Sequence, residues 1–101
     1  MDALRGVLQE SRKHYLDLEK RIGKKLKILP SGSVKVRRIA GLVYYYLQQR
    51  VGDKVVHRYL GKEKPDGFIK QISERRALKV ELRKVREGLK LVRRAEGRKR
   101  A

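Results

Sequence analysis

The strongest constraint on the fold of this chain is a change in hydrophobic period, from helical to strand-like and back to helical. In residues 3–22, apolar or near-apolar side chains recur at alternating spacings of four and three residues, which keeps them on one face of a helix. These side chains are Leu4, Leu8, Ser11, Tyr15, Leu18 and Ile22. Asp2 precedes all of them, where an aspartate caps a helix and suits its N-terminal dipole. The pattern predicts an amphipathic helix over about residues 3–25.

The helical period ends at a turn-forming segment, Leu29-Pro30-Ser31-Gly32-Ser33. Proline restricts the residue before it, and Gly and Ser favour turns. Three runs rich in β-branched and aromatic residues follow. They span 34–39, 42–50 and 54–60. Because Ala40-Gly41 and Gly52-Asp53 separate these runs, and tight hairpins require two-residue turns with glycine, the sequence predicts a three-stranded antiparallel meander.

A second helical period starts after a break that contains Pro65-Asp66. Eight positions, spaced alternately three and four residues apart, form a heptad stripe in which six are apolar. They are Phe68, Gln71, Arg75, Leu78, Leu82, Val85, Leu89 and Val92. The stripe predicts a long helix over about residues 67–95, a rod of about 40 Å. Its uninterrupted apolar part is the predicted packing seam and comprises Leu78, Leu82, Val85, Leu89 and Val92.

The sequence allows two packing partners for this seam. The first and last helices can pair antiparallel as a helical hairpin, with the sheet at one end, or the last helix can pair with its counterpart in a second chain as a dimeric coiled coil. We favour the hairpin, with a homodimer as an additional option. The predicted fold class is α+β, with the meander at about 33–61 between the two helices. One small domain is expected over 1–95, followed by a basic tail at 96–101 that contains Arg98-Lys99-Arg100.

The charge of the chain is large and unevenly distributed. It carries 29 Lys and Arg side chains against 11 Asp and Glu, for a formal charge of +18. Such a charge repels itself, so it indicates a polyanionic partner rather than a small-molecule substrate. Residues 1–19 sum to −1, residues 20–64 to +11 and residues 66–101 to +8. The middle region is therefore the predicted contact region.

Alternation along the strands assigns each side chain of the predicted sheet to one of two faces. The expected cross-strand pairs are Ile39 with Leu42, Arg37 with Tyr44, Lys35 with Tyr46, Arg50 with Val55, Gln48 with His57 and Tyr46 with Tyr59. The predicted core face comprises Val34, Val36, Val43, Tyr45, Leu47, Val56 and Leu60, with Arg38, Gln49 and Arg58 near its edges. The opposite face comprises Lys35, Arg37, Tyr44, Tyr46, Gln48, Arg50, His57 and Tyr59, with Ile39 and Val55.

The opposite face mixes basic, aromatic and amide side chains, and exposed aromatic clusters are typical of functional surfaces. A sheet can enter the major groove of DNA, where Arg and Lys reach guanine and Gln reaches adenine. Tyrosines can instead stack on unpaired bases, with Arg beside them on the backbone. We favour duplex DNA over RNA, because long hydrogen-bonding side chains surround the rings. The predicted nucleic-acid-binding residues are Lys35, Arg37, Tyr44, Tyr46, Gln48, Arg50, Lys54, His57 and Tyr59.

The hairpin region resembles a known family through three segments, LPSGS at 29–33, GLVYYYL at 41–47 and GDKVVHRYLGK at 52–62. They are similar to the LPxGS, GxxYYY and KVxxxYLGK pattern of a family of small uncharacterised prokaryotic proteins, over about residues 29–95. Residues 41–62 also resemble the N-terminal hairpin of some insertion-sequence transposases, with a Tyr-rich strand, a glycine turn and a Leu-Gly ending. That likeness implies DNA contact in a mobile element, plasmid or virus, without catalysis. The chain departs from the pattern at Val51-Gly52-Asp53, where Gly-Gly is frequent.

Nothing in the sequence indicates catalysis, a cofactor or a metal site. His14 and His57 lack the spacing of metal ligands, and the chain has no cysteine. A tyrosine nucleophile needs a positioned base or a metal cluster, whereas the Tyr-rich face offers one His and no acidic group. Acidic residues occur singly, and no glycine loop is typical of a phosphate site. We therefore predict that the protein is not an enzyme.

Two other functions compete with nucleic-acid binding. The seam can pair with itself or a partner, which would make the protein a coiled-coil interaction module. The basic last helix can lie on an anionic membrane, but it lacks the aromatic wedge residues of interfacial helices, so no membrane partner is expected. No apolar run approaches a membrane span or a signal peptide, which favours a cytoplasmic, nucleoid-associated protein. The absence of Asn and Trp, with abundant Lys, Arg and Glu, is a weak thermophile signature.

Overall fold

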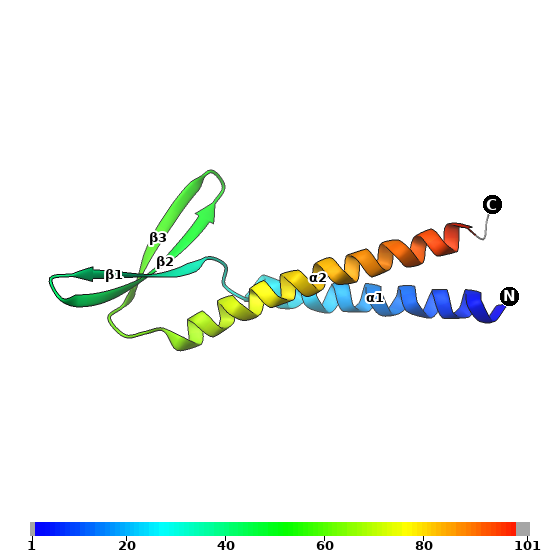
Figure 1. Ribbon diagram of the computed structural model, residues 1–101, viewed down its shortest axis with the longest axis horizontal. Helices are drawn as coiled ribbons and strands as arrows, with labels where there is room; N and C mark the ends of the chain where they lie inside the picture. The colour runs from blue at the N-terminus through cyan, green and yellow to red at the C-terminus, as the bar shows by residue number, and fades with distance from the viewer. Residues whose placement is uncertain (1, 99–101) are drawn as a thin grey trace. The chain divides into compact units, whose positions relative to one another are not determined.

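The structure of the protein is a computed structural model that describes residues 2–98 (Figure 1). Two helices enclose three strands along the chain, which confirms the α+β class and the predicted order of elements. The elements are α1 (Asp2–Ile28), β1 (Ser33–Ile39), β2 (Leu42–Val51), β3 (Lys54–Gly61) and α2 (Asp66–Arg98). Because α2 continues through Arg98, the rest of the predicted basic tail, residues 99–101, lies outside the described residues.

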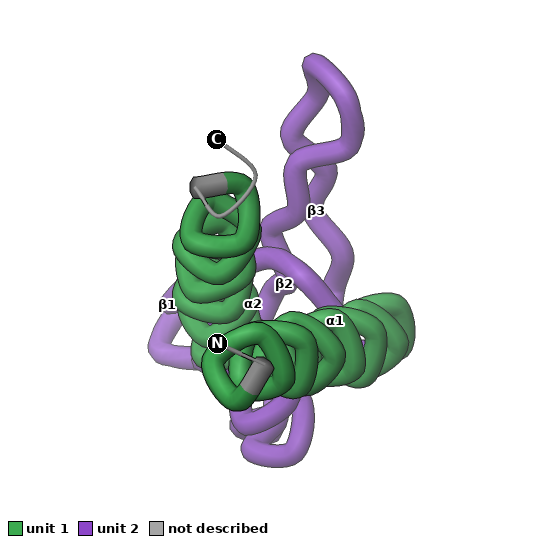
Figure 2. Tube along the Cα trace, turned by 90° about the vertical axis from the view of Figure 1, so that its right-hand side faces the viewer, with its two compact units in different colours: residues 1–28, 77–101 green, residues 29–76 purple. Residues whose placement is uncertain are grey.

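The chain divides into two compact units (Figure 2). The helical unit contains α1 and the described part of α2 from Ala77 onward, and the sheet unit spans Leu29–Arg76. The first turns of α2 therefore belong to the sheet unit, and the later turns belong to the helical unit.

In the helical unit, α1 and the later turns of α2 run antiparallel within one chain. Arg12 forms an ion pair with Glu96 at 2.9 Å, and Arg86 forms one with Glu19 at 3.1 Å. The unit's core consists of Ile22, Val85 and Leu89, each 4–5% exposed. The seam residues Leu78, Leu82 and Val92 are half-buried, and so are Leu8, Ser11, Tyr15 and Leu18 on the apolar stripe of α1. The seam is thus covered by α1 itself, as the predicted hairpin requires.

One seam residue of the first helix departs from the prediction. Leu4 is 55% exposed, although its spacing places it on the apolar stripe. It lies about two helical turns beyond Arg12, which already contacts Glu96 near the end of the described part of α2. The stripe continues there without a partner helix among the described residues.

The sheet has the order β1-β2-β3, and every predicted cross-strand pair is present in its register. The first turn has positive φ at both Ala40 (52°) and Gly41 (79°), which is the type I′ geometry that suits the strand twist. The second turn has positive φ at Gly52 (62°). The pairing between β2 and β3 shifts between Tyr45 and Tyr46, so that Tyr46 pairs with Tyr59 while Tyr45 pairs with Gly61. This bulge was not predicted from the sequence.

The first turns of α2 pack over the core face of the sheet within the sheet unit. Leu47 is 1% exposed and Ile72 is 4% exposed, whereas the predicted Gln71 is exposed. The correction has a simple cause: Ile72 lies four residues after Phe68 and three before Arg75, so it preserves the spacing and places an apolar side chain in the core.

Two valines of the predicted core face are exposed: Val36 at 56% and Val56 at 43%. Alternation predicted the face of both valines correctly, but it did not predict that they stay exposed on that face. Val36 lies on the edge strand, and Val56 pairs with Gln49 beyond the region where all three strands overlap.

The loop before β1 is fastened to the sheet unit by side chains. Gln49 donates a hydrogen bond to the carbonyl of Ser31 at 2.9 Å, and Arg75 donates one to the carbonyl of Leu29 at 3.3 Å. Gly32 has a φ of 113° and packs against β2, where an added Cβ would lie 2.5 Å from the carbonyl oxygen of Gln48. The glycine of the LPSGS segment is therefore required both by its backbone conformation and by its close approach to β2.

Candidate nucleic-acid interface

One face of the sheet, the tyrosine face, combines the predicted aromatic and basic side chains. The register aligns Lys35, Tyr46 and Tyr59 in one row across all three strands. The neighbouring rows pair Arg37 with Tyr44 on one side, and Ser33 and His57 with Gln48 on the other. The outermost rows pair Ile39 with Leu42 and Arg50 with Val55.

The three tyrosines form a contiguous cluster. The ring of Tyr59 lies 5.5 Å from that of Tyr46 and 6.2 Å from that of Tyr44, with interplanar angles of 56° and 52°. Tilted contacts at these separations are favourable for aromatic rings. Tyr44 and Tyr46 are half-buried, while Tyr59 is 52% exposed. The cluster is thus packed internally and still presents an aromatic surface to solvent.

Two cations lie over the rings of this cluster. The guanidinium carbon of Arg37 is 5.2 Å from the centroid of Tyr46, and Nζ of Lys62 is 5.9 Å from the centroid of Tyr44. Both distances are within the range of cation–π attraction. Lys62 was missed in the sequence analysis because it follows the last predicted strand. Its signal was the LGK ending of the third segment.

Most predicted contact residues lie on the tyrosine face, but they do not all join the cluster. Gln48 and His57 are paired one row away, and the Arg50 Nε donates to the carbonyl of Gly52 at 3.4 Å. Lys54 pairs with Val51 at the end of the second hairpin, so alternation places it on the opposite face from the tyrosines. The structure therefore separates Lys54 from the other predicted residues.

The strands carry a single sign of charge. No Asp or Glu occurs within the bounds of β1, β2 and β3, which contain six Lys and Arg residues. The cross-helix ion pairs belong instead to the helical unit. A basic surface without internal compensation is suited to a polyanion.

The sheet is three strands wide only at its centre. Residues 45–48 of β2 pair on both sides, whereas the ends of β2 pair with only one neighbour each. Two two-stranded ribbons therefore extend from the centre, and Figure 1 shows that they point in different directions. The tyrosine face continues along β2 from Leu42 to Arg50, about 27 Å at about 3.4 Å per residue.

Among residues 2–98, no group of three or more His, Cys, Asp or Glu side chains is placed to hold a metal ion. No helix within the same residues is long and apolar enough to cross a membrane.

Comparison with protein families identifies the chain. The model of one family, described as a domain of unknown function (DUF6788), matches residues 8–68. The match contains most of α1, the whole sheet with its tyrosine cluster, and the start of α2. No curated protein and no solved structure matches. Because the match covers more than half of the chain, the protein belongs to the DUF6788 family, whose function is unknown.

Proposed function

We propose that the protein binds nucleic acid, preferably duplex DNA, through the tyrosine face. One observation carries the proposal: three packed tyrosines are overlaid by Arg37 and Lys62 on a sheet whose strands contain no acidic residue. Phosphates attract such a surface, and its Arg, Lys, Gln and Tyr side chains supply donors for base edges. Binding of this kind needs no catalytic group.

The shape of the sheet favours duplex DNA over an unpaired strand. A two-stranded β-ribbon fits the major groove, and the sheet unit extends two of them from its centre. Stacking on unpaired bases requires an open ring face, but Arg37 lies over Tyr46, and the tilted rings pack against one another.

The likeness to transposase hairpins supports a more specific setting. It rests on the Tyr-rich β2, the glycine turn and the Leu60-Gly61 ending, and the structure has these in one sheet. We propose a DNA-binding protein of a mobile element, plasmid or virus that acts on the nucleoid. RNA binding is the alternative.

The test is a binding titration with a duplex, a single DNA strand and an RNA of the same sequence, each at several salt concentrations. Every phosphate contact adds about −0.9 to the log–log slope on B-DNA. We expect the triple Ala variant of Arg37, Tyr46 and Arg50 to bind duplex at least about tenfold more weakly. The double variant Arg38→Ala and Arg58→Ala is the matched control, because it removes two positive charges from the other face.

The outcomes separate the alternatives. A slope near zero, or equal losses in the triple variant and its control, would refute the tyrosine face as the contact surface. If RNA binds more tightly than duplex DNA, the ligand of this face is RNA and the proposal of DNA is wrong. Retention of duplex binding by the control alone supports the proposal.

A further inference from the structure

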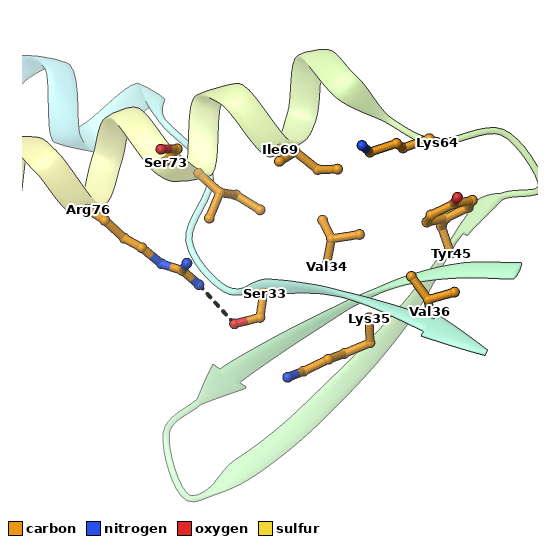
Figure 3. Close-up of a pocket in the computed structure, with 10 residues that line it drawn as sticks. Ser33, Val34, Lys35, Val36, Tyr45, Lys64, Ile69, Ser73 and Arg76 are labelled. Carbon is orange, nitrogen blue, oxygen red and sulfur yellow. Dashed lines mark hydrogen bonds between the residues drawn. The ribbon is translucent and has the colours of Figure 1, made fainter.

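A groove lies on the other side of the sheet, between β1 and the first turns of α2 (Figure 3). It belongs wholly to the sheet unit and has a volume of about 540 Å³. Its floor is apolar and is formed by Val34, Val36, Ile69 and Ile72. In Figure 3, the side chain of Lys35 points away from the helix, although Lys35 lines the groove together with its neighbours Val34 and Val36.

A cation lies toward each end of the groove. Arg76 is held there by hydrogen bonds from Nη2 to Ser33 Oγ at 3.0 Å and to the carbonyl of Gly32 at 3.2 Å. Lys64 lies toward the end where Tyr45 is, 3.9 Å from the carboxylate of Asp66. No acidic side chain lines the groove. Asp66 offsets part of the charge of Lys64, but Lys35 and Arg76 keep the lining positive. The groove therefore complements an anionic ligand with an apolar middle.

The backbone beside the groove is also available for pairing. Within residues 2–98, β1 pairs only with β2, so its outer edge offers unpaired N–H and C=O groups. Val36, on the core face of this edge strand, is 56% exposed. An edge strand next to an apolar groove is the arrangement that accepts an added strand from a partner.

We propose that this groove binds an extended acidic segment of a partner protein, which adds to β1 as a fourth strand. The segment places apolar side chains on Val34, Val36 and Ile69 and acidic side chains toward Arg76 and Lys64. From Ser33 to Val36 the strand extends about 10 Å, so about four residues of the partner fill the groove. The partner thus binds the face opposite the tyrosine face, and both faces can be occupied together.

The probe for this site, the alternating peptide, is a fluorescently labelled seven-residue peptide with Glu, Val, Val and Glu at every second position and Thr between them, so that all four side chains share the face toward the groove. A block peptide with both Glu first, then both Val and then the three Thr has the same composition and charge but lacks the alternation. The test variant is Val36→Asp, and Val56→Asp is its matched control, because both valines are exposed on the same face but only Val36 lines the groove. Arg76→Gln is compared with Arg58→Gln in the same way. Amide hydrogen exchange measures whether β1 gains protection and whether each variant retains the sheet.

We expect Val36→Asp and Arg76→Gln each to weaken binding of the alternating peptide by about tenfold, with little change in the two controls. The peptide should protect alternate amides of β1, and the block peptide should bind more weakly. Equal binding of both peptides, equal losses in test and control variants, or protection along β3 instead of β1 would overturn the proposal. Self-association without peptide that Val36→Asp abolishes would also overturn it, because the occupant would then be a second copy. None of these variants alters the tyrosine face, so duplex binding is scored independently.

Discussion

The helical unit and the sheet unit treat charge and apolar surface in opposite ways. In the helical unit, a stripe on each helix covers the other, and ion pairs such as Arg12 with Glu96 compensate charge across the interface. In the sheet unit, one face is partly covered by α2, and the other exposes cations that no acidic strand residue compensates. The helical unit buries most of its apolar stripe within itself, apart from Leu4. Both proposed contact surfaces lie on the sheet unit.

The glycines offer the largest test of this contrast. Gly32→Ala should lower the free energy of unfolding by about 3 kcal/mol, because the new Cβ would meet the Gln48 carbonyl oxygen at a φ of 113°. Gly52→Ala is the matched control: its φ is also positive, at 62°, but nothing lies within 4 Å. It should cost only about 1 kcal/mol. Urea denaturation measures both, and equal losses would show that the contact with β2 is unimportant.

The corresponding pair in the helical unit should show changes of opposite sign. An added Cβ at Gly88 would lie 2.8 Å from the Tyr15 ring, whereas nothing lies within 4 Å of one at Gly23. Gly23→Ala should raise the free energy of unfolding by about 0.5–1 kcal/mol through helix propensity. Gly88→Ala should lower it by about 1 kcal/mol, because the ring must move. Stabilisation by both substitutions would contradict the close approach of the two helices.

How much of each unit was predictable also differs. In the helical unit, the spacing of Leu78, Leu82 and Val85 predicted the buried stripe, since helix periodicity directly selects a face. In the sheet unit, turn positions predicted the register, and alternation then predicted which side chains share the tyrosine face. Neither pattern predicted the bulge beside Tyr45, because one extra residue leaves no periodic signal. Lys62 follows the last predicted strand, so alternation did not assign it to a face.

The partial cover of the core face was also not predictable, but for a different reason than the bulge. Alternation shows that Val36 and Val56 point toward the α2 side, but not how far the first turns of α2 reach over them. Spacing alone also did not distinguish Gln71 from Ile72. Both fit a helical period, but Gln71 is exposed and Ile72 is buried. Such cover depends on tertiary packing, whereas face assignment depends on local geometry. The groove beside β1 results from tertiary packing, so it could not be predicted from the sequence.

The turn between β1 and β2 supplies a smaller test within the sheet unit. Ala40 adopts a φ of 52°, a left-handed conformation that costs a non-glycine residue free energy. Ala40→Asn creates the Asn-Gly pair that type I′ turns prefer, and it should raise the free energy of unfolding by about 0.5 kcal/mol. Thermal denaturation measures this gain, with Ala3→Asn in the exposed first turns of α1 as a control that should gain nothing. A loss at Ala40 would contradict the type I′ geometry.

Two substitutions with small expected effects on stability compare the role of a positive charge in the helical unit with that of one in the sheet unit. Arg86→Gln removes the exposed ion pair with Glu19, and Arg37→Gln removes the cation over Tyr46; each should change the free energy of unfolding by at most about 0.5–1 kcal/mol. Their effects on duplex binding should differ. If Arg37 contacts a phosphate, its loss reduces the salt slope by about 1, while loss of Arg86, already neutralised by Glu19, leaves the slope nearly unchanged. Equal reductions in slope would mean that binding follows the net charge of the whole chain rather than the tyrosine face, and the contrast between the units would then concern stability alone.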